Sequence, residues 1–110
     1  MKTALAALAA SLIAAGGAYA GGPRDNALSH IAQVIATAQL CPDLEANDIM
    51  VGQIARHFDI DFDRDRGELL KMVDLQMLPW RGKPPGFACS AGYTLYGPSG
   101  ADVPGLLMKR

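Results

Sequence analysis

The chain has 110 residues, half of them hydrophobic, with 19% charged residues, two cysteines and a net charge of −1 at neutral pH. This near-neutral balance argues against a nucleic-acid-binding protein, which needs a basic stripe, and no basic amphipathic segment favours a membrane surface. The length predicts one small domain, which buries only about 60 to 65% of its unfolded surface and is marginal without a cross-link.

Residues 1–20 have the pattern of a secretory signal peptide. Lys2 provides a positive start, an apolar run follows over residues 4–15, and Ala18, Tyr19 and Ala20 form a small-x-small cleavage site. The alternative, a transmembrane anchor, is disfavoured because the apolar run is shorter than the roughly 20 residues that a bilayer needs. We therefore expect a periplasmic or secreted protein with one domain, residues 21–110, and no membrane insertion after cleavage.

Two amphipathic helices are predicted next. The first covers residues 26–40, with Asp25 or Asn26 to cap its first amides, and the second covers residues 49–58, with Asn47 as its N-cap. Residues 41–47, CPDLEAN, are expected to form the turn between them. The predicted inward-facing residues are Leu28, Ile31, Val34, Ile35 and Ala38 in the first helix and Val51, Ile54, Ala55 and Phe58 in the second.

An acidic stretch precedes a third predicted helix, which Pro79 ends. Asp65 and Glu68 have the spacing of a capping box, and carboxylates at this end face the positive end of the helix dipole. The acidic residues are Asp59, Asp61, Asp63 and Asp65, and the predicted inward-facing residues are Leu69, Leu70, Val73 and Met77.

The alternative for the same stretch, residues 59–65, is the calcium-binding loop of an EF-hand. That loop needs a glycine at its sixth position and a glutamate at its twelfth. Counting from Asp61 puts Arg66 and Met72 there, and counting from Asp59 fails in the same way. A solvated, capping turn is therefore favoured over calcium binding, and we predict no metal site and no cofactor.

Residues 80–86, WRGKPPG, differ in composition from the rest of the chain. Consecutive prolines favour an extended segment. Trp80, Arg81 and Lys83 are the best candidates for a partner-binding surface, since tryptophan and arginine are enriched in binding hot spots. The alternative is that Trp80 covers one end of the core while the two cations stay solvated.

The last helix is predicted over residues 87–96, and Gly97 followed by Pro98 forms its stop signal. Helical spacing puts two sets of residues on adjoining faces. The first set is Cys89, Tyr93 and Tyr96, and the second, small and apolar, is Ala88, Ala91, Gly92 and Leu95.

Cys41 lies at the predicted end of the first helix, before Pro42, and Cys89 lies near the start of the last. In an oxidising compartment we expect these cysteines to form a disulfide, and the alternative is two buried thiols. The predicted fold is all-α: about four helices closed by this disulfide, with an extended C-terminal tail packed across them.

The residues for catalysis are sparse. His30 and His57 lie on different predicted helices, with no second ligand at metal-binding spacing, and are expected at the surface or at the core boundary. The cysteines lack the C-x-x-C spacing of redox or haem-attachment motifs. A nucleophilic Cys89 needs a nearby histidine, and His57 is a formal candidate. A hydrolase-like enzyme, with His57 next to Asp59 or Cys89, is the least favoured function.

Two motifs, CPxLxxN at residues 41–47 and YGPxGxxVPGLL at residues 96–107, resemble those of small exported proteobacterial proteins of uncharacterised activity. The matching residues are Cys41, Pro42, Leu44, Asn47 and Cys89, with residues 96–98, 100 and 103–107. The resemblance covers the mature chain in outline and implies no activity. Two cysteines in a small exported helical protein are also similar to the acid-stress periplasmic chaperones, which implies a chaperone as the alternative function.

From these observations we predict a non-enzymatic binding module. It would meet another periplasmic protein through the Trp80 linker or through the exposed tail. A chaperone would instead need an apolar face that is released under stress.

Overall fold

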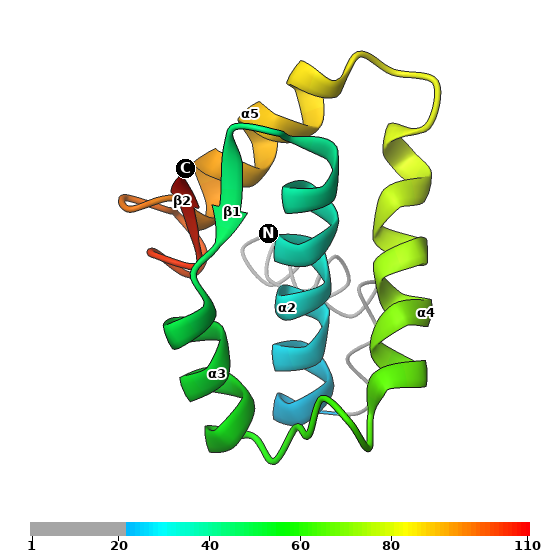
Figure 1. Ribbon diagram of the computed structural model, residues 1–110, viewed down its shortest axis with the longest axis vertical. Helices are drawn as coiled ribbons and strands as arrows, with labels where there is room; N and C mark the ends of the chain where they lie inside the picture. Colours follow the sequence, from blue (N-terminus) through cyan, green and yellow to red (C-terminus); the bar gives the residue numbers. More distant parts are fainter. Residues whose placement is uncertain (1–21) are drawn as a thin grey trace, which may run out of the picture.

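The computed structural model describes residues 22–110, so the predicted signal peptide, residues 1–20, lies outside the described residues. Within this range, helix α2 lies at the centre and helices α3, α4 and α5 pack around it (Figure 1). The α-helices are α2 (Pro23–Leu40), α3 (Asp48–His57), α4 (Arg66–Met77) and α5 (Pro85–Tyr96). The other elements are a 3-10 helix, η2 (Leu78–Trp80), and the strands β1 (Leu44–Ala46) and β2 (Leu107–Lys109).

The central helix α2 is buried on almost every side, whereas the sequence predicted a single inward face. Leu28, Ile31 and Val34 are fully buried as predicted, but Ile35 and Ala38 are only partly buried. Ala27, Ala32, Ala36 and other small residues are buried as well, so neighbouring helices can approach this helix closely. The helix also begins at Pro23, before the predicted start, because proline fits the first turn, where no amide partner is needed.

The prediction of a purely all-α fold is wrong, because the tail forms a strand. β2 pairs antiparallel with β1, with Leu44 opposite Lys109 and Ala46 opposite Leu107. The expected turn at residues 41–47 therefore contains a strand. This ribbon supplies backbone partners for a segment whose Leu106 and Leu107 side chains are fully buried in the core.

Helices α3 and α4 follow the predicted pattern with two exceptions. Asn47 caps α3 as expected, its side chain accepting a hydrogen bond from the Met50 amide. On α4, Leu69 and Val73 are buried, but Leu70 points outward and is half-exposed, so its predicted inward position is wrong. Pro79 does not end the chain's helical path, since η2 continues it as far as Trp80.

The predicted disulfide is present and joins the end of α2 to the first half of α5. The Cα atoms of Cys41 and Cys89 are 5.7 Å apart, and Cys41 is fully buried. The bond holds α5 across the end of α2. Both cysteines are therefore part of the frame of the fold.

The contact between α5 and α2 depends on Gly92. A Cβ atom at this position would lie 2.5 Å from Cγ2 and 2.7 Å from Oγ1 of Thr37. Thr37 is buried, and its hydroxyl donates a hydrogen bond to the Gln33 carbonyl, so it cannot easily move. Glycine here sets how closely the two helices pack.

We expect the double variant Cys41→Ala/Cys89→Ala to lose about 4 kcal/mol of unfolding free energy, because the cross-link no longer restricts the unfolded chain. Urea denaturation measures this loss, and the unmodified protein in reductant should show the same decrease. Ser90→Ala, next to the bond, is the control. Labelling of both sulfurs by an alkylating agent without reductant would contradict the disulfide.

We expect Gly92→Ala to destabilise the protein by about 1 to 3 kcal/mol, because overpacking against Thr37 outweighs the gain in helix propensity of roughly 1 kcal/mol. Thermal and urea denaturation measure the change. Gly86→Ala, on the same helix with open space around it, should be neutral or stabilising. Adding Thr37→Ala to Gly92→Ala should restore part of the loss, and no rescue would argue against this clash.

Candidate partner-binding groove

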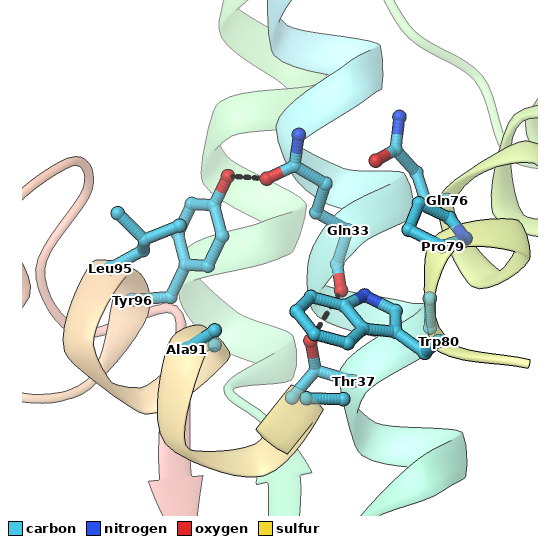
Figure 2. A pocket seen from close by; sticks show the side chains of 11 residues that line it. Gln33, Thr37, Gln76, Pro79, Trp80, Ala91, Leu95 and Tyr96 are labelled. Atoms are coloured by element: carbon cyan, nitrogen blue, oxygen red, sulfur yellow. Dashed lines mark hydrogen bonds between the residues drawn. The ribbon is translucent and has the colours of Figure 1, made fainter. Parts of the chain in front are cut away.

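An open groove of about 200 Å³ lies between α2, α5 and the segment where α4 continues into η2. Figure 2 shows the Trp80 indole beside Thr37 on one side of the groove, with Leu95 and Tyr96 of α5 on the other. The lining residues come from all four elements: Gln33, Ala36, Thr37, Gln76, Pro79, Trp80, Ala88, Ala91, Gly92, Leu95 and Tyr96. The groove exists because the facing residues of α5 are mostly small and cannot fill the space.

The structure places Trp80 in the wall of this groove. Trp80 ends η2 and is half-buried, so one part of the indole packs on the protein while another part remains accessible. Lys83 lies over the same indole, with its Nζ atom 5.9 Å from the ring centroid, at cation–π distance. Arg81 follows Trp80 directly and is exposed. Of the three residues singled out from the sequence, Trp80 lines the groove, whereas Arg81 and Lys83 are its neighbours and are not part of the lining.

The polar groups of the groove include unused hydrogen-bond donors. The Tyr96 hydroxyl donates to Gln33 Oε1, and the Thr37 hydroxyl donates to the Gln33 carbonyl. Within residues 22–110, no partner is present for the amide nitrogens of Gln33 and Gln76 or for the Trp80 indole nitrogen. Among those same residues, none that lines the groove is charged. The groove can therefore accept an apolar group and donate hydrogen bonds around it.

Sequence reasoning did not find Gln33, Gln76 and Tyr96 as groove residues. Glutamines in amphipathic helices are usually solvated, and Tyr96 was predicted only to share a face with Cys89. A usable signal was the absence of any charged residue in α5, residues 85–96, although most of that helix is not deeply buried. A helix that is exposed in the isolated chain but carries no charge is compatible with a surface that a binding partner covers.

The acidic stretch forms a compact loop held by arginines. The Asp61 carboxylate accepts hydrogen bonds from the backbone amides of Asp63 and Arg64, which lower its pKa. Asp65 makes no cap bond to α4, so the predicted capping box is wrong. Its carboxylate instead accepts from the Asp61 amide and pairs with Arg64 and Arg24, each 2.9 Å away.

This pairing changes the acidity of Asp65. The hydrogen bond from the Arg64 side chain, with that from the Asp61 amide, holds the Asp65 pKa far below its ordinary value. Arg24 belongs to α2, so Asp65 ties the loop to the central helix. In the described part of the chain, no three His, Cys, Asp or Glu side chains are grouped as metal ligands.

The residues of the hydrolase alternative take other roles. Cys89 is bonded to Cys41, so its sulfur is not a free nucleophile. His57 is exposed at the end of α3, and its ring stacks edge-on against Phe58, with the ring centroids 4.8 Å apart.

Among the helices of residues 22–110, none has the length and apolar character to cross a membrane.

Comparison with protein-family models, curated proteins and solved structures finds no match for this chain.

We expect Asp65→Asn to lower Tm by a few degrees at pH 7, because it removes the charge that Arg24 and Arg64 face. The lowered folded-state pKa means that this stabilisation is present above the ordinary carboxyl pKa of about 4 and is lost as the pH falls through the lowered value. The Tm difference between the two proteins should persist down to about pH 4 and shrink below it. Circular dichroism melting from pH 2 to 7 measures it.

Asp63→Asn is the matched control for this experiment. The Asp63 side chain is 95% exposed, whereas that of Asp65 is 11% exposed. Removal of the Asp63 charge should leave Tm nearly unchanged at every pH. Equal effects of the two substitutions would contradict the role given to Asp65.

Proposed function

We propose that the protein is a non-enzymatic, exported binding module whose groove receives one large apolar side chain of a partner protein. The observation that carries this proposal is the size of the groove, about 200 Å³. Pockets for small molecules usually measure about 300 to 1,000 Å³. A volume below that range suits a single anchoring side chain, which is how many protein interfaces obtain most of their affinity.

The surroundings of the groove support a protein partner. Leu78, Phe87 and Leu95 are large, exposed and apolar, and they belong to η2 and α5, two of the four elements that line the groove. Of these, Leu95 lines the groove itself, so part of the groove wall is exposed apolar surface. The amides of Gln33 and Gln76 and the Trp80 indole can donate hydrogen bonds to backbone carbonyls of a bound segment.

The charges indicate what accompanies the apolar anchor. Helix α5 contributes no charge, and Arg81 and Lys83 are the cations next to Trp80. A partner segment with a carboxylate near its apolar anchor would complement this arrangement. Such rim charges raise association rates and give specificity more than affinity.

Export is part of the same proposal. It rests on the predicted signal peptide at residues 1–20 and on the Cys41–Cys89 disulfide, a bond typical of oxidising compartments. The partner would then be another periplasmic protein.

We expect Trp80→Ala to weaken binding of the partner by about 30-fold, as loss of an aromatic hot spot does. Partners are recovered from a periplasmic extract by affinity capture, and the Kd of each purified candidate is then measured by calorimetry. Ile49→Ala is the matched control, since Ile49 is 74% exposed on α3, outside the groove lining. Ala91→Phe should also abolish binding, because it fills the groove and leaves Trp80 in place.

Three outcomes would contradict the proposal. One is equal recovery and equal Kd for the Trp80→Ala protein. Another is unchanged binding by Ala91→Phe. The third is an association rate that does not fall with added salt, because Arg81 and Lys83 would then not contribute to the encounter. Protection of many unfolded clients at low pH, without saturable binding, would favour the chaperone alternative.

A further inference from the structure

A second cavity, of about 350 Å³, lies between the first half of α2, helix α3 and the segment that leads to β2. Its walls are largely apolar and include Ala27, Ile54, Phe58 and Val103. Asn26 and His30 are its polar lining residues. Unlike the groove at Trp80, this cavity is within the size range of small-molecule sites.

The His30 imidazole is held from one side by two acceptors. Its Nδ1 atom lies 2.9 Å from the Tyr96 hydroxyl oxygen and 3.5 Å from Oδ2 of Asp102. Because the Tyr96 hydroxyl donates its hydrogen to Gln33 Oε1, its oxygen is left to accept from His30. A carboxylate also only accepts. Both contacts therefore favour hydrogen on Nδ1.

The other ring nitrogen is consequently a hydrogen-bond acceptor. In the neutral imidazole with hydrogen on Nδ1, Nε2 carries a lone pair. Within residues 22–110, no group donates to Nε2. The His30 side chain is 24% exposed and lines the cavity. The cavity thus has apolar walls and a lining histidine whose Nε2 is an acceptor in this tautomer.

We propose that this cavity binds a small phenol, with the ring against Phe58 and Ile54 and the hydroxyl donating a hydrogen bond to Nε2 of His30. The aromatic rings of Phe58 and His30 favour an aromatic ligand, since ring pairs add to the energy of apolar burial. The acceptor at Nε2 selects a ligand with a donor over a pure hydrocarbon. Carboxylates are disfavoured because Asp102 already brings negative charge to this histidine. The site shares no lining residue with the partner-binding groove.

The test compares p-cresol with toluene, which has the same shape but no hydroxyl. We expect p-cresol to bind about threefold to tenfold more tightly, the range for one hydrogen bond between neutral groups. Titrations followed by amide chemical shifts at pH 8 measure both affinities. The largest shifts should occur at Ala27, Ile54, Phe58 and Val103.

The substitution His30→Asn removes the acceptor at Nε2 while keeping the hydrogen bond that supports the fold. The asparagine amide can replace the Nδ1 donor toward Tyr96 but offers no group at the place of Nε2. We expect this variant to bind p-cresol and toluene equally, and the control His57→Asn to keep the preference. Val103→Phe, which fills the cavity from the tail, should abolish binding of both ligands.

Several outcomes would overturn the proposal. Equal affinities for p-cresol and toluene in the unsubstituted protein would show that the phenol hydroxyl forms no hydrogen bond with His30. A preference for p-cresol that survives His30→Asn would place the acceptor elsewhere. Shifts confined to the Trp80 groove, or loss of p-cresol binding in Trp80→Ala, would show that the ligand uses the other site.

Discussion

The covalent tie between Cys41 and Cys89 fixes the end of the central helix to α5, and the rest of the structure depends on that fixed position. One turn beyond Cys89, Gly92 packs directly on Thr37. Another turn on, Tyr96 is buried against α2. A chain this short buries little apolar surface, so a cross-link supplies a large share of its net stability. The close helix contact then determines where the remaining side chains can lie.

That contact also explains the groove. Helix α5 approaches α2 through Ala88 and Gly92, which are too small to fill the space toward η2. A larger residue at either position would push the helices apart. Trp80 borders the space from the other side without closing it, because η2 holds its backbone at the end of α4. The groove is thus a consequence of small residues under a covalent constraint.

Much of the helical framework could be predicted from the sequence, because helix boundaries have local causes. Asn47 before an apolar stripe and Pro98 after Gly97 are such signals. The disulfide was predicted from the expected export signal together with two cysteines placed near predicted helix ends. The strands could not be predicted, since three residues are too few to show an alternating pattern, and their pairing joins Leu44 with Lys109 across most of the domain.

Long-range polar contacts were the second feature that could not be predicted from the sequence. The sequence suggested a local capping role for Asp65, but the carboxylate pairs with Arg24 of another helix. Tertiary ion pairs of this kind leave no periodic pattern. For the candidate groove, the unusual composition at Trp80, Arg81 and Lys83 was visible in the sequence. Gln33 and Gln76 were not, because their role depends on which helices face each other.

The Tyr96 hydroxyl links the two cavities through one ordered chain of hydrogen bonds. Gln33 Oε1 can only accept, so it takes the hydroxyl hydrogen, and the oxygen then accepts from Nδ1 of His30. Without that acceptor, the hydroxyl could donate to Nδ1, and Nε2 would carry the hydrogen instead. Asp102 acts in the same direction as Gln33. Whether Nε2 of His30 is an acceptor in the second cavity therefore depends partly on Gln33, which lines the first.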